Sequence, residues 1–346
     1  MKLGLLAAGM GPRAQVNLEL LLQAESLGYD SAWTAEAWGA DAVTTATWIL
    51  ARTTRLRVGT AILQMPSRTP ALAAMTAMSL DHLSGGRFIL GLGASGPQVV
   101  EGWHGVPYGR PLTRTREYIE ICRKVFRREE RLEHAGYHYQ IPIRGEGTTG
   151  LGKPLKSILH GNPDIPIYTA SISPKGLATA AELADGVLPL WMNPERFDVI
   201  EEPLREGFAR AGGGKNLESF AVCPTVTVVM GDDLEKCRMP AKAALSLYIG
   251  GMGARDKNFY NDYARRLGYD EAAAEIQDLY LAGKRNEAFA AVPDALVDDL
   301  FLMGPRERIV DRLQAWKAAG KARQIDTLLV ASAQPEVLQL LAEEIL

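Results

Sequence analysis

The sequence lacks the features typical of membrane proteins, disulfide-stabilised proteins and nucleic-acid-binding proteins. It has no run of about twenty apolar residues, so no membrane span is expected. Its three cysteines are scattered and form no C-x-x-C pair, which argues against a disulfide framework or a zinc site and favours the cytoplasm. A net charge of −3 argues against a nucleic-acid partner.

Familiar catalytic motifs are missing as well. The chain contains no H-E-x-x-H, no G-x-S-x-G, no Walker loop and no carboxylate-rich cluster, so no metal site is expected. A site without these groups is typical of a protein whose cofactor brings its own reactivity, and we expect a small-molecule substrate.

What is present is an alternation of strand-like and helical runs. It is clearest over residues 56–96, where apolar, β-suited residues 58–63 precede a small-residue helix over 70–83 and a second buried strand over 88–92. Parallel strands joined by a helix form a βαβ unit, and such units bind ligands in the loops that follow their strands.

The alternation continues along the chain. Strands are predicted at 3–7, 31–34, 58–63, 88–92, 165–170, 186–189, 220–230 and 325–330. Helices are predicted at 15–27, 41–52, 70–83, 113–131, 174–183 and 194–211. Eight strands in this pattern favour a single α/β domain over residues 1–346, a closed TIM-like (β/α)₈ barrel.

Two stretches break the rhythm, and we interpret them as insertions at about 132–164 and 232–303. The first contains a short strand-like piece and a glycine-rich run, and we expect it to cover the mouth of the barrel. The start of the chain, M-K-L-G-L-L-A-A-G-M, is interpreted as a buried first strand and not as a signal peptide.

The turn S-I-S-P-K-G at residues 171–176 follows a predicted strand directly. Ser173 can cap the next helix, and Pro174 suits its first position. The free N–H groups of that helix start, two hydroxyls and Lys175 make a site for a phosphate. The alternative is an ordinary capped helix.

The turn G-L-G-A-S-G-P-Q at residues 91–98 resembles a dinucleotide loop only superficially. Its spacing fails G-x-G-x-x-G, and no acidic residue follows at the required distance. Nicotinamide binding is therefore disfavoured, and the glycines are interpreted as places where the backbone approaches a flat ring or a phosphate.

Two side chains at the end of the second predicted strand are candidate catalytic residues. Glu36 could act as an acid or a base, and Trp38 could form a stacking wall. Glu36 could instead cap a helix or pair with an arginine. Glu101 and His104 lie three residues apart, a spacing that we interpret as a surface contact in preference to a catalytic pair.

At these residues the chain resembles the luciferase-like flavin and deazaflavin oxidoreductases. The resemblance covers nearly the whole length and rests on L-G-Y-D-S-A-W-T-A-E, R-L-R-V-G-T-A-I, S-L-D-H-L-S-G-G-R-F-I-L-G-L-G, P-I-Y-T-A-S-I-S-P-K-G and A-D-G-V. The turn G-A-S-G-P-Q is similar to that of the branch that uses coenzyme F-420, an 8-hydroxy-5-deazaflavin, called the deazaflavin below. The family implies a TIM-like barrel and hydride transfer to or from C5 of this coenzyme.

The resemblance also assigns residues. A non-proline cis peptide bond would fall at Ala61–Ile62, where its bulge presses on the coenzyme ring. Backbone around Gly93 and phosphate contacts at Ser95 and Gly96 would complete that side. The remaining phosphate contacts would fall on the stretch from strand end to helix start, at Ala170, Ser171, Ser173, Lys175 and Gly176.

Departures from the family leave the chemistry open. Ala37 stands where the alcohol-oxidising branch has a histidine, Gly96 lies near that branch's glutamate, and Leu5 or Leu6 lies near the strand-one glutamate of the pterin reductases. No substrate follows. An FMN-dependent monooxygenase of the same fold and a non-catalytic flavin-binding protein remain alternatives.

Quaternary structure is predicted from two helices. The helix over 70–83, with Met75 and Met78, is apolar on more of its circumference than one stripe requires, and Trp48 and Ile49 add surplus on the helix over 41–52. A patch of that size predicts association, and we expect a homodimer formed through these helices.

Overall fold

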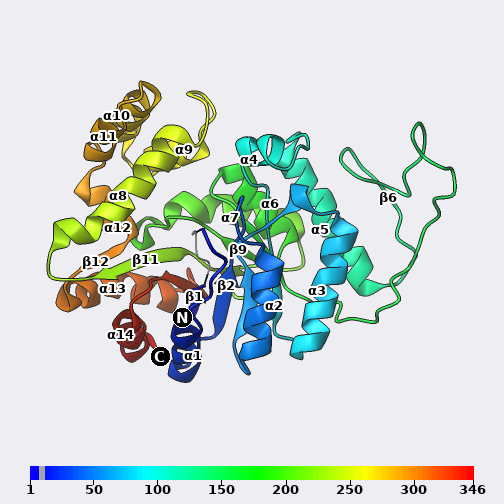
Figure 1. The fold of residues 1–346 in the computed structure, drawn as a ribbon, viewed down its shortest axis with the longest axis horizontal. Coiled ribbons are helices and arrows are strands. Elements are labelled where there is room, and N and C mark those ends of the chain that lie inside the picture. The colour runs from blue at the N-terminus through cyan, green and yellow to red at the C-terminus, as the bar shows by residue number, and fades with distance from the viewer. Residues whose placement is uncertain (8–11) are drawn as a thin grey trace.

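Parallel strands form a ring surrounded by helices in the computed structural model, which describes residues 1–7 and 12–346 (Figure 1). Residues 8–10, the end of the amino-terminal run quoted above, lie outside the described residues. The strands are β1 Lys2–Leu6, β2 Ser31–Thr34, β3 Arg57–Thr60, β4 Leu63–Gln64, β5 Phe88–Gly93, β6 His134–Ala135, β7 Gln140–Ile141, β8 Ile167–Ala170, β9 Gly186–Leu188, β10 Ala221–Val222, β11 Thr225–Met230, β12 Leu302–Gly304 and β13 Thr327–Ala331. The helices are α1 Leu18–Leu27, α2 Ala42–Arg52, α3 Pro70–Ser84, α4 Pro97–Gly102, α5 Pro111–Arg127, α6 Pro174–Leu183, α7 Asp198–Ala211, α8 Leu234–Gly251, α9 Phe259–Arg266, α10 Asp270–Leu281, α11 Arg285–Ala290, α12 Asp294–Leu300, α13 Arg306–Lys321 and α14 Pro335–Ile345.

The ring of strands is closed, as predicted. Neighbouring strands run in the order β9, β8, β5, β3, β2, β1 and β13, with β10 paired to β9 and β11 paired to β13, all parallel. The N–H of Asp326 donates to the Val222 carbonyl at 2.9 Å, and that of Leu329 donates to the Pro224 carbonyl at 2.9 Å. These bonds join β10 to β13 and confirm the TIM-like (β/α)₈ barrel.

Two of the predicted strands are each divided. The stretch 58–63 becomes β3 and β4, separated by the Ala61–Ile62 peptide bond, which is cis. The stretch 220–230 becomes β10 and β11, separated by Pro224, which has no N–H with which to continue a ladder. The division lets one segment pair with β9 and the next with β13, and so closes the ring.

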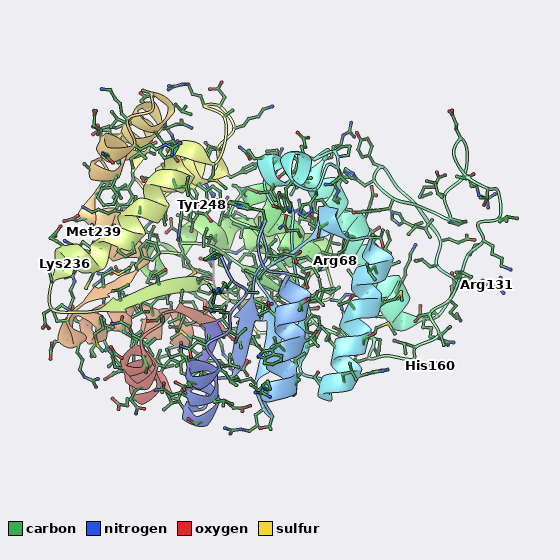
Figure 2. The ribbon with its side chains drawn as sticks, viewed as in Figure 1. Arg68, Arg131, His160, Lys236, Met239 and Tyr248 are labelled. Atoms are coloured by element: carbon green, nitrogen blue, oxygen red, sulfur yellow. The ribbon has the colours of Figure 1, made fainter. Side chains whose placement is uncertain are left out.

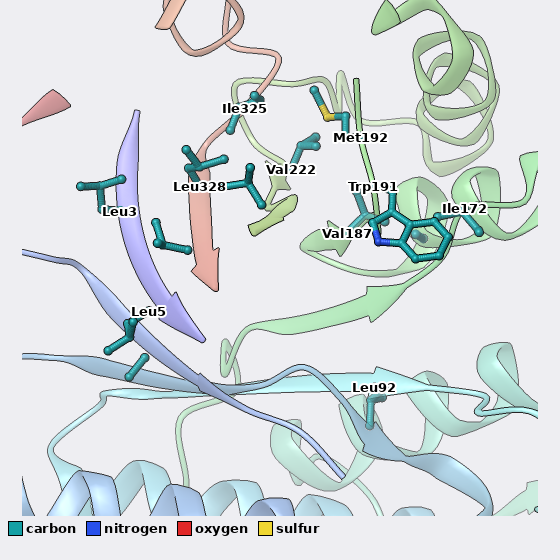
Figure 3. Packing of buried hydrophobic residues seen from close by; sticks show 14 of the residues in the cluster. Leu3, Leu5, Leu92, Ile172, Val187, Trp191, Met192, Val222, Ile325 and Leu328 are labelled. Carbon is teal, nitrogen blue, oxygen red and sulfur yellow. The ribbon is translucent and has the colours of Figure 1, made fainter. Parts of the chain in front are cut away.

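The inside of the barrel is filled by side chains from opposite strands. The rings of Trp33 and Tyr168 stack there, with centroids 5.8 Å apart and planes at 25°. A Cβ at Gly59 would collide with the Trp33 indole, so a glycine is required beside it. On the other face of the strands, Leu3, Leu5 and Leu328 belong to the larger core beneath the helices (Figure 3).

Several helix ends differ from the predictions for local reasons. The helix predicted over 15–27 begins at Leu18, because the Asn17 carboxamide accepts the N–H of Leu20 at 3.1 Å and caps it. The helix predicted over 113–131 runs from Pro111 to Arg127 and ends where Arg128 adopts a left-handed conformation with φ 52°. Asp41 caps α2, in agreement with its predicted place at that N-terminus.

The stretch 232–303 forms five helices, α8 to α12, that lie beside the barrel (Figure 1). It also contains β12, a strand that the alternation did not predict, which pairs with β11 outside the ring. No described helix has both the length and the apolar character needed to cross a membrane.

The stretch around 132–164 does not cover the mouth of the barrel, so that prediction was wrong. Figure 1 shows it extending away from the ring beyond α3 and α5. It connects the end of α5 to the start of β8. The Glu117 carboxylate on α5 accepts the N–H groups of Tyr137, His138 and Tyr139 at 2.7, 2.9 and 3.0 Å and holds the base of this arm.

The helix surfaces predicted to associate are smaller than expected. Trp48 on α2 and Met75 on α3 are half-exposed, at 52% and 53%. Ile49 and Met78, by contrast, are fully buried. Gly161 of the arm packs against the Met78 side chain, so the chain itself covers this part of the predicted patch.

Candidate functional site

The carboxyl ends of β3, β4 and β5 bring three predicted residues together. The cis bond between Ala61 and Ile62 interrupts the strand, and the Ile62 side chain lies over Gly93, where a Cβ would collide with it. Gln64, two residues farther on, stands in register with Gly93. Ala61 and Ile62, which we call the ridge, therefore form an apolar surface at the end of the barrel where ligands bind in this fold.

Glu36 holds this ridge in place. Its N–H donates to the Ile62 carbonyl at 3.3 Å, and its carboxylate accepts the N–H groups of Gln64 and Ala42 at 2.8 and 3.1 Å. The same carboxylate forms an ion pair with Arg68 at 2.9 Å. The Ser67 hydroxyl also donates to this carboxylate at 3.5 Å. The carboxylate predicted as an acid or base is therefore occupied by structural partners, and one alternative considered above, a pair with an arginine, is present.

The Arg68 guanidinium also pairs with Asp41, the cap of α2. Burial acts to raise the pKa of Asp41, but hydrogen bonds from Thr44 and the charge of Arg68 hold that pKa below its ordinary value. Arg68 thus links the ridge to the start of α2 and has both of its nearby carboxylates as partners.

Trp38 lies on the loop between β2 and α2 and is 54% exposed. It forms no aromatic pair within residues 1–7 and 12–346. The structure therefore leaves Trp38 accessible at the carboxyl end of the barrel.

Gln64 is a polar group of this site that the sequence did not single out, and His104, which was predicted to form a surface contact with Glu101, lies beside it. The buried Gln64 carboxamide donates to the Ala37 carbonyl at 2.6 Å, so its oxygen faces His104 Nε2, 3.3 Å away. This orientation makes Nε2 the donor and leaves Nδ1 without a partner among residues 1–7 and 12–346. Glu101 instead accepts the Tyr108 N–H at 3.1 Å, so the two residues of the predicted surface contact have different partners.

The turn after β5 places Ser95 and Gly96 beside these groups. Ser95 has a φ of 59°, a left-handed conformation that is uncommon for a residue with a side chain, and its carbonyl accepts the Tyr108 hydroxyl at 3.2 Å. Gly96 immediately precedes α4. The turn therefore presents backbone at the end of the strand, as expected for close approach to a ligand.

The predicted phosphate turn forms the start of α6. Ser173 caps the helix, its hydroxyl accepting the N–H of Gly176 at 3.2 Å, and the Ser171 hydroxyl occupies the position that a Cβ on Gly176 would need. Ala170, the last residue of β8, and Lys175 are both exposed. The two hydroxyls thus lie together at the helix N-terminus, and the exposed Lys175 belongs to the same turn.

Arg266, which the sequence did not indicate, joins the turn from α9. One guanidinium nitrogen, Nη2, donates to the Ile172 carbonyl in the middle of the turn, whereas Nη1 is buried and has no partner among the described residues. Burial lowers the pKa of Arg266. An unpaired buried guanidinium nitrogen beside a helix N-terminus fits an anionic group such as a coenzyme phosphate.

Two cavities lie at the other end of the molecule. One, of about 720 Å³, is lined by Phe208 and Leu204 of α7 and by Lys215. The second, of about 340 Å³, includes Lys2, Asp185 and Asp326, which precede or begin strands. Ligands of this fold bind at the carboxyl ends of the strands, so we do not assign either cavity as the ligand site.

The chain is similar to known proteins over nearly its whole length. The model of a family described as luciferase-like monooxygenase matches residues 3–323. The "Putative coenzyme F420-dependent oxidoreductase Rv3520c" of Mycobacterium tuberculosis is 46% identical over 94% of this chain and 95% of its own length. The 5,10-methylenetetrahydromethanopterin reductase of Archaeoglobus fulgidus is 27% identical over 93% of this chain and 92% of its own length.

Solved structures share the fold. The coenzyme F420-dependent tetrahydromethanopterin reductase of Methanopyrus kandleri superposes with a TM-score of 0.78, at 22% identity, over 99% of this chain and 98% of its own. An F420-dependent secondary alcohol dehydrogenase in complex with an F420–acetone adduct superposes with a TM-score of 0.71, at 19% identity, over 99% and 98%.

Proposed function

Because the chain belongs to the luciferase-like monooxygenase family, we propose that it is a deazaflavin-dependent oxidoreductase that transfers a hydride between C5 of the coenzyme and an organic substrate. The relative at 46% identity, named for the same coenzyme, supports this proposal over nearly the whole chain. The observation that supports it most directly is that the ridge and the turn before α6 lie at the same end of the barrel. We call this turn, together with Arg266, the cradle.

The residues present fit such a coenzyme. Ile62, lying over Gly93, would back the ring, and the backbone of Ser95 and Gly96 would lie along its edge. The cradle at the start of α6 would receive the phosphate, with Ser171, Ser173, Lys175, Gly176 and Arg266 as the groups nearest to it. When bound, the deazaflavin supplies the hydride donor or acceptor that the side chains lack.

We propose different roles for the two candidate catalytic groups and for His104. Glu36 positions the ridge, because its carboxylate is committed to Arg68 and backbone N–H groups. Trp38, exposed on its loop, would form a wall of the site. His104 would exchange the substrate's proton at Nδ1, since its Nε2 is engaged by Gln64.

A hydride-transfer assay tests the proposed function. The protein is mixed with reduced deazaflavin and a panel of carbonyl, alkene, imine and alcohol compounds (oxidised coenzyme for the alcohols), and coenzyme oxidation state is followed by its visible absorption. We expect turnover with at least one class. Coenzyme binding without turnover in any class would favour a non-catalytic flavin-binding protein, and turnover that needs FMN and oxygen would favour a monooxygenase.

The quaternary state and location are also proposals. We propose a homodimer formed through α2 and α3, supported by the exposed apolar side chains of Trp48, Leu72 and Met75. We propose a cytoplasmic location, supported by three buried and unpaired thiols, Cys122, Cys223 and Cys237.

A further inference from the structure

Three aromatic side chains from separate segments meet beside the coenzyme cradle. The Trp191 ring, just after β9, lies 5.2 Å from that of Tyr248 on α8 and 5.6 Å from that of Tyr260 on α9. The two tyrosine rings are 4.8 Å apart, edge to face. We call Trp191, Tyr248 and Tyr260 the aromatic wall. Figure 2 shows α8 running from Lys236 and Met239 on its outer side to Tyr248 beside the barrel.

The wall adjoins the groups assigned to the coenzyme. Figure 3 shows Trp191 next to Ile172, whose carbonyl is bound by Arg266. On the other side, Tyr108 is a neighbouring phenol that contributes to the raised pKa of Tyr260, and the Tyr108 hydroxyl donates to the Ser95 carbonyl at 3.2 Å. The wall therefore has neighbours both in the turn before α6 and in the segment that holds the turn after β5.

The backbone of Trp191 is held in an unusual conformation. Its φ is 58°, in the left-handed region that bulky residues avoid, and its side chain is only 6% exposed. Such conformations persist only where surrounding structure holds them, and they are concentrated at ligand sites. Contacts with Tyr248 and Tyr260 hold the indole in its place.

The hydroxyls of the wall are available to a ligand. Neither Tyr248 nor Tyr260 makes a side-chain hydrogen bond within residues 1–7 and 12–346, and neither hydroxyl is among the buried unpaired atoms there. Burial, with the neighbouring phenols of Tyr248 and Tyr108, raises the pKa of Tyr260 to about 12, and burial also raises that of Tyr248. Both phenols are neutral donors at neutral pH.

Two arginines near this end of the barrel have partners within the chain. Arg68 pairs with Glu36 and Asp41, and Arg266 binds Ile172 beside the cradle proposed for the coenzyme phosphate. Beside the wall itself, a substrate would find aromatic rings and phenol hydroxyls. Flat rings favour stacking and edge-to-face contact with a flat partner.

We infer that the aromatic wall is the substrate-binding surface of this enzyme and that it takes an uncharged, planar, mostly apolar molecule with one carbonyl or hydroxyl oxygen that accepts from Tyr248 or Tyr260. The inference rests on the proposed function. It disfavours phosphorylated sugars and other anionic substrates.

Calorimetry on the protein saturated with oxidised deazaflavin tests this inference without turnover. The probes are 1-tetralone, an uncharged aryl ketone, and glucose 6-phosphate, a phosphorylated sugar. We expect heat of binding from 1-tetralone only. Tyr248→Phe and Tyr260→Phe each remove one hydroxyl, and at least one of them should weaken 1-tetralone binding about 2- to 10-fold. Tyr137→Phe, on the exposed arm, should not.

The possible results separate the two claims. Deazaflavin binding is measured first, by fluorescence, on every variant; if wild-type protein does not bind it, the proposed function and this inference are both overturned. If the coenzyme binds but 1-tetralone does not, if glucose 6-phosphate binds more tightly, or if both tyrosine variants bind 1-tetralone as wild type does, the substrate inference alone is overturned.

Discussion

Replacing Arg266 by Met should weaken binding of the deazaflavin while sparing its phosphate-free nucleoside. Methionine keeps the length and apolar body of the side chain but removes the guanidinium. The substitution eliminates the bond to the Ile172 carbonyl and the buried Nη1 that has no partner among the described residues. If that nitrogen faces the coenzyme phosphate, the loss falls on ligands that carry one.

The expected size follows from the chemistry of the contact. A hydrogen bond to a charged group contributes about 1.5–3 kcal/mol. Arg266 is only partly buried, so solvent screening places the effect in the lower part of that range, at about 1.5–2 kcal/mol. Since about 1.4 kcal/mol is a factor of ten, the Kd should rise about 10- to 30-fold.

Fluorescence titrations with the deazaflavin and with its nucleoside, which ends before the phosphate, measure this effect. Arg265→Met is the matched control, because Arg265 lies on the same helix, loses the same charge and instead binds Asn261 at 2.8 Å. Equal weakening of both ligands would indicate a general disturbance of the fold, and unchanged affinity for both would show that the phosphate lies elsewhere.

Three further predictions test other parts of the structure. Glu36→Gln should lower the free energy of unfolding by about 1–3 kcal/mol, because it removes the charge facing Arg68 and one acceptor that holds the ridge; an unchanged urea midpoint would contradict the positioning role. Burial acts to raise the pKa of Glu117, but hydrogen bonds from three backbone N–H groups hold that pKa below its ordinary value. The arm should therefore be fully anchored above the ordinary pKa and lose this anchoring as pH falls through the lowered pKa. Amide exchange of the arm should show this loss in wild type, whereas exchange in the Glu117→Gln variant should not depend on the titration of residue 117. Met75→Glu should shift the light-scattering mass from dimer to monomer, whereas Met239→Glu, equally exposed at 54% on α8, should not; a monomeric wild type at micromolar concentration would refute the dimer.

The order of elements was predictable because buried strands and amphipathic helices alternate and because clear capping residues, glycines and prolines mark their ends. Asp41 and Ser173 cap the helices that the sequence assigned to them, and the proline at the start of α6 stands where its missing N–H is harmless. The loops after β3, β5 and β8 could be assigned to one end of the sheet, since all carboxyl ends of parallel strands lie there.

Contacts between distant segments were not predictable from local pattern. Arg266 lies 94 residues from Ile172, and His104 lies 40 residues from Gln64, so no spacing rule joins either pair. The direction of the arm was also missed, because it depends on contacts between distant residues, such as the Glu117 carboxylate that holds the arm's base to α5.

The division of the predicted strand over 220–230 could have been predicted from a proline that lies within the apolar run. Pro224 cannot donate a ladder hydrogen bond, so it marks the point at which the segment changes partners. The strand β12, only three residues long, carries no alternation of its own and is defined by pairing with β11.

The most direct test of the central claim is a parallel equilibrium titration of the purified protein with the deazaflavin and with FMN. Both ligands carry a flat ring and a phosphate, so the comparison isolates the fit of the ring to Ile62 and Gly93 and of the tail to the start of α6. The proposed function predicts a lower Kd for the deazaflavin. Tighter binding of FMN would contradict it.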